Sequence, residues 1–366
     1  MKLAYFTQSI VSCWNHGNAH FLRGVMTELQ ERGHHVTVYE PRSSWSRGNL
    51  VHDHGEAPLA TFREAFPALR PHLFDYESVD VEELVDGMDV VVVHEWTEPW
   101  LVGEIGRARA HGGSFRLLFH DTHHRMATAP HELERYDLSA YDGVLAYGRV
   151  IADLYAERGY CAWTWHEAAD TRIFKPLPAV EKRGDLVWVG NWGDGERTEE
   201  LHEFLLRPAR KLRLRGSVFG VRYPPRAARA VEKSGLTYRG FVENHRVPEI
   251  FAEHRVTVHV PRRPYREKLR GIPTIRPFEA LACGIPLVSA PWDDVEQLFS
   301  PGSDFLVARD RREAVDQLRT LLHDDDAARR LAEHGLATIQ ARHTCAHRAG
   351  ELEGICGALG VKEAVR

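Results

Sequence analysis

The sequence predicts an α/β protein made of two domains, each built around a parallel β-sheet. Short apolar runs alternate with segments of helical periodicity along the chain, and this alternation is typical of right-handed β-α-β crossovers. With 366 residues, the chain is also too long for one typical hydrophobic core and fits about two domains. The alternation forms two series, which are separated by the proline-containing stretch 170–184.

The first series occupies the amino-terminal half. It begins with the β-rich run KLAYFT at 2–7 and an amphipathic helical segment at 18–33, which stops at Gly33. Another helix is expected at about 99–111. Four more strands are expected, at residues 34–40, 89–95, 114–120 and 143–148.

The second series is followed by helical sequence alone, at 310–360. Its expected strands lie at residues 185–191, 215–220, 236–240, 256–261, 285–290 and 304–308. We expect two Rossmann-like domains that face each other across a cleft, at 1–170 and 171–345, and a terminal helix at 346–366 that is a candidate to pack back on the first. Open parallel sheets bind ligands beyond the carboxyl ends of their strands, so the loops there are the candidate sites.

Composition and charge argue against several classes of partner. The chain has 47 Lys and Arg against 52 Asp and Glu, a net charge of -5, which disfavours nucleic acid and membrane surfaces as partners. No apolar run approaches the roughly 20 residues that span a bilayer. The amino terminus reads as a first strand rather than a signal peptide, and the five cysteines form no C-x-x-C pair. We expect a cytoplasmic protein, and nothing in the sequence indicates its oligomeric state.

The loop after the first strand, QSIVSCWNHGNAH, is the first candidate site. Asn15, His16, Gly17 and Asn18 are typical turn and helix-cap residues. Gly17 would let a substrate approach the helix start, whose amides favour an anion or a sugar oxygen. A capped turn that needs glycine only for its backbone is the alternative. The loop has no G-x-G-x-x-G pattern, which argues against a nicotinamide cofactor.

The segment FHDTHHR follows a predicted buried strand and concentrates titratable side chains. Asp121 and His123 suit proton transfer or the stabilisation of developing charge, and Arg125 closes the segment. Four possible metal ligands occur here: His120, Asp121, His123 and His124. Because they are crowded into five residues without a distant Cys or His partner, we expect a polar active-site loop and no metal. A solvated loop is the alternative.

The segment VGNWGDGERTEEL follows the first strand of the second series. Its glycines allow the chain at Asn191 and Trp192 to pass close to a phosphate. Arg197 would lie in the first turn of the next helix, where the helix dipole disfavours a cation. An arginine there is easier to explain if it holds an anion, although a surface arginine is the alternative. The segment lacks G-K-[ST] and is not a P-loop.

The segment GIPTIRPFEALACGIPLVS, at 271–289, places three polar residues at the start of a helix that Gly284 ends. Thr274 and the first amides can bind phosphate oxygens, and Arg276 adds a planar donor for the same group. Glu279 lies on the same helix and can accept hydrogen bonds from a vicinal diol such as that of ribose. The pattern fits a nucleoside diphosphate sugar, and a surface Arg276–Glu279 ion pair is the alternative.

The run EALACGIPLV resembles the E-A-x-A-x-G-x-P-[VL]-[VI] signature of glycosyltransferases with the GT-B fold. With FHDTHHR, WHEAADTRIFKP and RGFVENHRVPEIFAEH, the chain is similar to the CgeB-like (spore-maturation-protein-like) branch of the group 1 glycosyltransferases up to about residue 345. The resemblance implies an acceptor-facing first domain and a donor-binding second domain. It also implies transfer from a UDP- or dTDP-linked sugar to an acceptor, which would be a small molecule, a glycan or a protein, without an obligatory metal or other cofactor.

The resemblance assigns roles to particular residues. It implies that Glu279 holds the ribose, Arg197 the diphosphate, and Gly240 and Phe241 the base. His123 would lie near the transferred sugar.

One position departs from the pattern of the similar enzymes. Retaining enzymes of this kind commonly have a second glutamate eight positions before the ribose glutamate, and Gly271 stands there. Retention is expected from the resemblance alone; an inverting reaction would use Asp121 or His123 as its base. Two other functions fit the same features: a GT-B-fold sugar-nucleotide epimerase and a non-catalytic sugar-nucleotide-binding protein.

Overall fold

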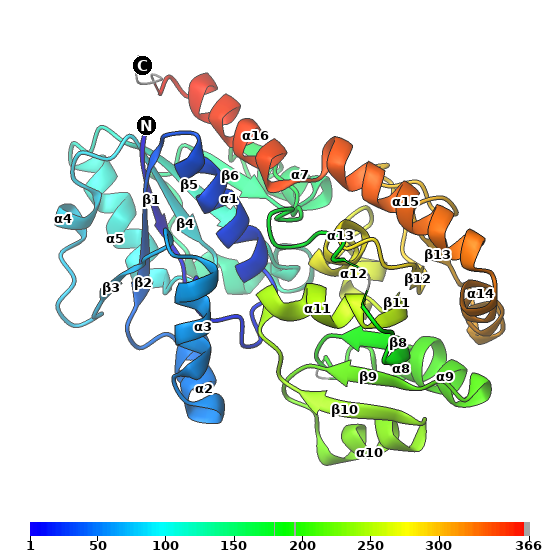
Figure 1. Cartoon of the computed structure of the whole chain (residues 1–366). Coiled ribbons are helices and arrows are strands. Elements are labelled where there is room, and N and C mark those ends of the chain that lie inside the picture. Colours follow the sequence, from blue (N-terminus) through cyan, green and yellow to red (C-terminus); the bar gives the residue numbers. More distant parts are fainter. Residues whose placement is uncertain (179, 194, 362–366) are drawn as a thin grey trace. The chain divides into compact units, whose positions relative to one another are not determined.

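Two separate parallel β-sheets organise the chain (Figure 1). The computed structural model describes residues 1–178, 180–193 and 195–361, so the last five residues of the predicted terminal helix lie outside the described part. Contacts between residues divide the chain into two units. The first unit comprises Met1–Glu167 and the carboxyl-terminal segment from Cys345, and the second comprises Ala168–Thr344.

The sheet of the first unit has seven parallel strands in the order β3-β2-β1-β4-β5-β6-β7. Its strands are β1 Lys2–Phe6, β2 His35–Pro41, β3 His72–Phe74, β4 Val90–His94, β5 Arg116–Asp121, β6 Gly143–Ala146 and β7 Ala162–Thr164. Its helices are α1 Ala19–Glu31, α2 Trp45–His54, α3 Ala57–Ala65, α4 Val81–Val85, α5 Pro99–Ala110, α6 Arg125–Thr128, η1 Pro130–Arg135, α7 Arg149–Ala156 and α16 Cys345–Ala358. The strand order reverses between β1 and β4, so ligands of this sheet are expected at the carboxyl ends of these two strands.

The second unit has six parallel strands in the order β10-β9-β8-β11-β12-β13, with the reversal between β8 and β11. Its strands are β8 Gly184–Val189, β9 Gly216–Phe219, β10 Leu236–Gly240, β11 His254–His259, β12 Leu287–Ser289 and β13 Leu306–Val307. Its helices are α8 Thr198–Leu201, the π-helical η2 His202–Leu206, α9 Arg207–Leu212, α10 Pro225–Lys233, η3 Asn244–Arg246, α11 Val247–Ala252, α12 Arg263–Glu267, α13 Ile275–Ala282, α14 Arg311–His323 and α15 Asp325–Arg342.

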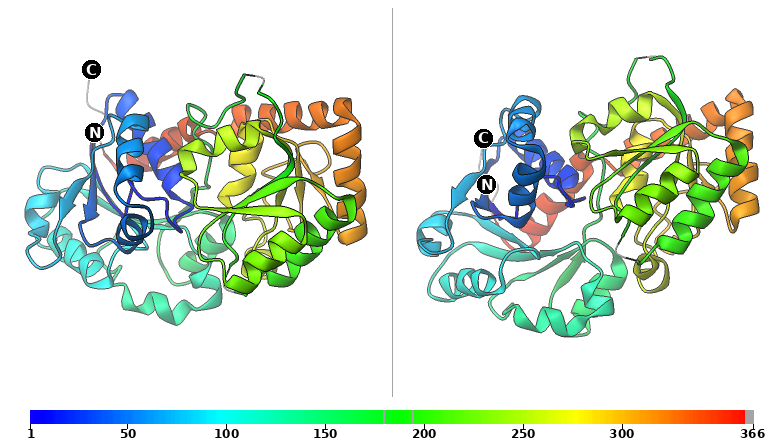
Figure 2. Two further views of the ribbon diagram at one scale, coloured as in Figure 1. Left: turned by 60° about the horizontal axis from the view of Figure 1, so that its bottom comes forward. Right: turned by 90° about the horizontal axis from the view of Figure 1, so that it is seen from below.

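Burial of the strands on both faces explains their continuous apolar sequence. Val90, Val91, Val92 and Val93 of β4 are all fully buried, because helices lie against each sheet (Figure 2). The two-sheet α/β architecture confirms the predicted fold class. The sequence did not predict β3 and β7, which are three-residue strands at the two edges of the first sheet and carry little apolar signal.

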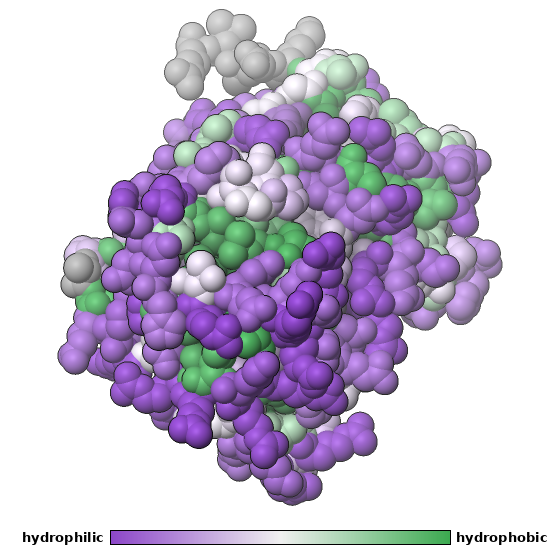
Figure 3. Space-filling view, turned by 90° about the vertical axis from the view of Figure 1, so that its right-hand side faces the viewer, coloured by the Kyte–Doolittle hydropathy of each residue, from purple (hydrophilic) through white to green (hydrophobic). Residues whose placement is uncertain are grey.

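The outer surface carries mainly hydrophilic residues on the face that Figure 3 shows, and its apolar residues gather in separate patches. Within the described residues, no helix combines the length and the apolar character that a membrane crossing requires.

The carboxyl-terminal helix α16 belongs to the first unit, where it packs against α1 (Figure 1). Arg348 is 3% exposed and donates from Nε to the carbonyl of His166 at 2.9 Å, while its own carbonyl accepts from Trp165 Nε1 at 2.9 Å. These contacts attach α16 to the segment that follows β7.

Replacing Arg348 with methionine keeps the apolar stem but removes the charged donor to the carbonyl of the half-buried His166. We expect Arg348→Met to lower the free energy of unfolding of the first unit by about 1.5–3 kcal/mol, the usual value for a hydrogen bond to a charged group. Urea denaturation followed by circular dichroism measures this change. Arg135→Met, at an exposed position of η1, is the control and should change stability by less than about 0.5 kcal/mol. Equal stabilities of the two variants would contradict the assignment.

Candidate functional site

In the second unit, Arg197 is a half-buried cation beyond the carboxyl end of β8. Its guanidinium donates to the carbonyls of Val260 at 3.0 Å and Asn191 at 2.5 Å, and it lies 5.1 Å from the ring centre of Trp188. Its Nε atom is buried and has no hydrogen-bond partner among the described residues. Gly193, at φ +89°, makes this packing possible, because a Cβ there would lie 2.9 Å from Arg197 Nε.

Positive charge accumulates around Arg197. Desolvation, followed by the neighbouring guanidinium groups of Arg262 and Arg276, lowers the pKa of Arg197 to about 9. Arg262 is paired with Glu196 at 3.0 Å, whereas Arg197 has no carboxylate partner within the described part of the chain. A half-buried cation that bonds only to carbonyls favours the approach of an anion.

A histidine inside the sheet orients the start of α13. Ser289 Oγ donates to the carbonyl of Ala290 at 2.8 Å and therefore accepts from His259 Nδ1, which lies 2.9 Å away. Burial lowers the pKa of His259 to about 3, so the ring is neutral and its Nε2 accepts from the Thr274 hydroxyl at 3.1 Å. The Thr274 proton is thus used by His259, and the backbone amides of α13 remain as the donors at this helix start.

Arg276 and Glu279 form an ion pair, as the alternative interpretation of this segment expects. The pair is not on the surface, however, because the Glu279 side chain is 0% exposed. Asn244 Nδ2 also donates to Glu279 Oε1 at 2.6 Å. The structure therefore brings together the predicted phosphate and ribose residues, but a ligand at Glu279 must compete with two protein partners.

The predicted base-binding residues lie on the loop whose Asn244 bonds to this carboxylate. Gly240 ends β10 with φ +75°, Phe241 follows it, and Asn244 begins η3 three residues later. Asn244, which the sequence did not single out, links this loop to Glu279. Its position three residues after Phe241 of the RGF motif is the signal that could have identified it.

Two other predicted phosphate contacts have mainly structural partners. Asn191 Oδ1 accepts from the amide of Val221 at 2.9 Å. Trp192 is 4% exposed, packs in the core of the second unit and donates to Thr198 Oγ1 at 3.0 Å. Only the backbone of Trp192 is left for contact with a ligand.

At Gly271 the backbone has φ +95°, which favours glycine. A Cβ there would lie 2.7 Å from Cγ and 3.0 Å from Oε1 of Glu296. A carboxylate from another segment therefore lies beside the position where the similar enzymes have a glutamate.

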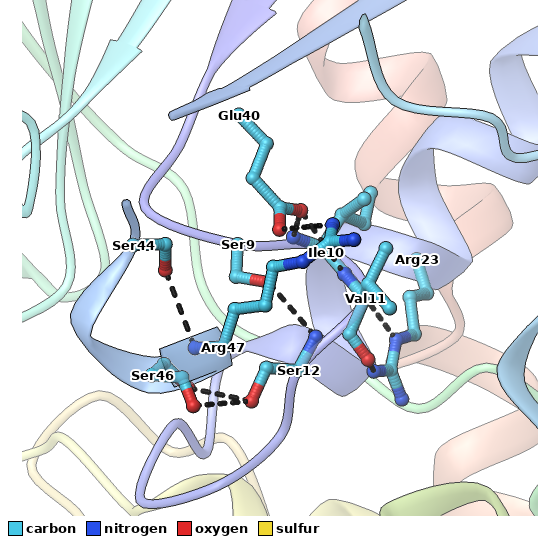
Figure 4. Close-up of polar contacts among 9 residues, drawn as sticks. All are labelled: Ser9, Ile10, Val11, Ser12, Arg23, Glu40, Ser44, Ser46 and Arg47. Atoms are coloured by element: carbon cyan, nitrogen blue, oxygen red, sulfur yellow. Dashed lines mark hydrogen bonds and ion pairs between the residues drawn. The ribbon is translucent and has the colours of Figure 1, made fainter. Parts of the chain in front are cut away.

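In the first unit, buried polar contacts fix the loop after β1 (Figure 4). Glu40 is fully buried and accepts from the amide of Ile10 at 2.9 Å, and Ser12 Oγ donates to the carbonyl of Ser46 at 3.0 Å. Ser46 Oγ in turn donates to the carbonyl of Trp14 at 2.7 Å. The loop that carries the predicted residues 15–17 is therefore rigidly attached to β2 and α2.

His16 of this loop is the first of three neutral histidines whose rings lie in a row. His16 is 5% exposed, and its ring centre lies 6.0 Å from that of His94, which lies 5.4 Å from that of His120. Burial lowers the pKa of His16 and His94 to about 3, and that of His120 well below its usual value. Asn18 does not cap α1 through its side chain, contrary to the sequence prediction, and instead donates to Thr122 Oγ1.

Two buried carboxyl groups lie at the ends of β4 and β5. Asp121 is fully buried, accepts from Tyr155 OH at 2.8 Å and from the amide of His123 at 3.0 Å, and has a pKa that burial and then Glu95 raise to about 7. Glu95 accepts from Thr122 Oγ1 at 2.9 Å, and burial raises its pKa to about 7 as well. Glu95 was not among the candidate residues predicted from the sequence. It ends one predicted buried strand, and Asp121 directly follows another.

His123 and Arg125 lie closer to solvent, beside an exposed aromatic ring. Trp96 is 40% exposed, its ring centre lies 5.3 Å from that of His123, and the Arg125 guanidinium lies 4.6 Å from it. Arg125 also donates to the carbonyl of Glu95 at 3.3 Å. The structure therefore brings Asp121, His123 and Arg125 together at one edge of the first sheet.

No group of three or more His, Cys, Asp or Glu side chains suited to a metal ion occurs in the ranges 1–178, 180–193 and 195–361. The absence of a metal from the reaction stays a prediction.

The raised pKa of Glu95 predicts a pH dependence of stability. Between about pH 4.5 and pH 7 the folded protein keeps a proton on Glu95 that the unfolded chain has lost, so the free energy of unfolding falls as pH rises. We expect Glu95→Gln to remove this pH dependence. From pH 5 to pH 7.5 the free energy of unfolding of wild type should therefore fall by about 1–3 kcal/mol more than that of the variant. Denaturation at a series of pH values measures it. The exposed Glu134→Gln should follow wild type, whereas parallel curves for Glu95→Gln would contradict the assignment.

Comparison with known sequences finds a matching family for part of the chain. Residues 197–354, less than half of the chain, match the sequence model of a family described as glycosyl transferase-like. No curated protein matches the chain significantly by sequence.

Solved structures resemble nearly the whole chain. Anabaena Alr3699/HepE, solved in complex with UDP and glucose, has a TM-score of 0.67 at 12% identity and covers 98% of this chain and 100% of its own. A glycosyltransferase from Rickettsia africae ESF-5 has a TM-score of 0.68 at 10% identity, with 99% of both chains covered. Sucrose-phosphate synthase from Thermosynechococcus elongatus has a TM-score of 0.65 at 15% identity, covering 98% of this chain and 99% of its own. At these identities the likeness shows the fold, which is GT-B.

Proposed function

We propose that this protein is a glycosyltransferase that takes a sugar from a nucleoside diphosphate sugar bound to the second unit. The observation that carries the proposal is Arg197, a half-buried cation at the carboxyl edge of the second sheet whose Nε atom is buried and has no partner among the described residues. The glycosyl transferase-like match, which begins at this residue, and the GT-B fold support it.

Donor binding on the second unit requires an exchange of partners. The diphosphate would accept from Arg197 Nε and from the first amides of α13, and it would draw Arg276 away from Glu279. Glu279 would then accept from the ribose hydroxyls. Because each charged group replaces one strong partner with another, the exchange leaves no buried charge unpaired.

The catalytic effect of this arrangement is electrostatic. Negative charge grows on the diphosphate as the sugar leaves, and the guanidinium groups of Arg197 and Arg276 stabilise that charge. No covalent step on the protein and no metal is required by the proposal. A uridine or thymidine donor and retention of configuration are proposed on the resemblance alone.

The first unit would supply the acceptor side. His123 is half-buried and accessible, whereas Asp121 is fully buried and bonds to the His123 amide and to Tyr155. We assign His123 to contact with the transferred sugar or the acceptor hydroxyl, and Asp121 to positioning. In an inverting reaction His123 would be the base.

Removing the half-buried cation should weaken donor binding. We expect Arg197→Met to raise the Kd for UDP by about tenfold or more, since hydrogen bonds to charged groups contribute about 1.5–3 kcal/mol. Isothermal titration calorimetry measures it, with circular dichroism to verify folding. Arg215→Met, at the exposed amino end of β9, is the control and should bind UDP as wild type does. Unchanged affinity in Arg197→Met would exclude Arg197 as the diphosphate residue.

The role of Glu279 can be separated from that of the phosphate contacts. Glu279→Gln should bind UDP about tenfold more weakly, because an amide is a weaker acceptor for the ribose hydroxyls than a carboxylate. Inorganic pyrophosphate should bind equally or more tightly, because Arg276 loses its competing carboxylate. Parallel weakening of both ligands would instead indicate that the substitution disrupts the site as a whole.

Transfer itself is tested with UDP-sugars and a panel of acceptors. Formation of a glycosylated product supports the proposal. A new sugar isomer formed without any acceptor would indicate an epimerase instead, and binding without turnover would indicate a non-catalytic protein.

A further inference from the structure

A cavity of ≈ 250 Å³ lies in the first unit, among α2, α3 and the segment before β3. Its walls are mainly apolar and include Leu59, Phe62, Phe66 and Leu73. The volume is slightly below the usual range for small-molecule pockets, which fits a single aromatic ring or a short acyl chain.

Three arginines and no acidic residue line this cavity. Arg47 is half-buried and contacts the buried carboxylate of Glu40 at 3.3 Å (Figure 4). Arg70 is exposed and, among the residues described, donates to the carbonyl of Pro67 alone, at 3.3 Å. Arg63 is exposed and forms no ion pair with any residue that the structure describes. An apolar cavity with this excess of positive charge is complementary to an apolar molecule that carries an acid group.

A buried guanidinium packs against Phe62 and Phe66, the aromatic side chains of the cavity wall. Arg23 is 1% exposed and lies 4.9 Å from the ring centre of Phe62 and 5.3 Å from that of Phe66. It also donates to the carbonyls of Ile10 at 2.7 Å and Val11 at 2.6 Å, as Figure 4 shows. One side chain therefore joins the cavity wall to the loop after β1, so the cavity is preformed and a ligand bears little ordering cost.

The position of the cavity relates it to the polar cluster of the same unit. Val11 follows β1 and Arg47 follows β2, so both lie beyond the carboxyl ends of their strands. Asp121 and His123 lie at that edge of the same sheet, at the end of β5. The loop that contributes Val11 to the cavity also carries His16 to the histidine row.

We propose that this cavity binds a small amphipathic acid, an aromatic ring or short acyl chain that bears a carboxylate. The ring or chain lies against Phe62, Phe66 and Leu73, and the carboxylate accepts from Arg63 and Arg70. If the protein is a glycosyltransferase as proposed, this acid is the acceptor, and the cavity holds its apolar part. This assignment of the acceptor class rests on the proposed function.

Binding is tested by calorimetry on the whole protein without nucleotide, with benzoate, 4-hydroxyphenylacetate and octanoate and with the uncharged amide of each. We expect at least one acid to bind, with its amide about tenfold weaker or more, because charge-assisted hydrogen bonds to arginine are lost. If no acid binds, or if acids and amides bind equally, the proposal is overturned.

A charge-reversal variant locates the binding. Arg63→Glu with Arg70→Glu should abolish detectable binding of the acid, and both positions are exposed, so folding should be unaffected. The matched control is Arg158→Glu, an exposed arginine that donates to the carbonyl of Leu154 at 2.9 Å, much as Arg70 does to Pro67; it should bind like wild type. Binding by the double variant with wild-type affinity would overturn the site.

These measurements separate this inference from the proposed function. Binding of the acid needs no donor, so it can succeed even if UDP does not bind or no sugar is transferred. Conversely, transfer that proceeds equally well in wild type and in the double variant would retain the glycosyltransferase assignment and overturn the cavity as the acceptor site.

Discussion

The half-buried positive charge of Arg197, which has no carboxylate partner among the residues that the structure describes, is the constraint around which the second unit is organised. Within the described ranges, Arg197 bonds to two carbonyls and lies over an indole ring, while Arg262 and Arg276 add to the local positive charge. Such an arrangement is costly in a protein interior and is retained most easily where an anion supplies the missing charge. Gly193 and His259 serve the same edge of the sheet. The positive φ of Gly193 leaves room for Arg197, and the neutral His259 accepts from Thr274 at the start of α13.

The first unit has the opposite electrostatic character. Its strand ends carry neutral imidazoles and carboxyl groups whose pKa is raised by burial. Carboxyl groups with a pKa of about 7 exchange protons near neutral pH, and they suit an acceptor hydroxyl better than a phosphate. In the proposed reaction, the second unit would stabilise the developing charge and the first unit would handle the proton.

The sequence was sufficient for the fold class and for the edges of the sheets that carry the sites. Buried parallel strands and the Gly284 stop of α13 leave strong local patterns, whereas the three-residue edge strands β3 and β7 leave almost none. Contacts between distant residues were not predictable in this way. The Asn244–Glu279 bond, the link of His259 to Thr274 and the Asn18–Thr122 bond each depend on how separate loops meet.

The most direct test of the account is a crystal structure of the protein with UDP. The account predicts a phosphate oxygen within hydrogen-bond distance of Arg197 Nε, Arg276 turned from Glu279 to the diphosphate, and the ribose hydroxyls on Glu279. UDP bound elsewhere, or bound while the Arg276–Glu279 ion pair stays intact, would contradict it.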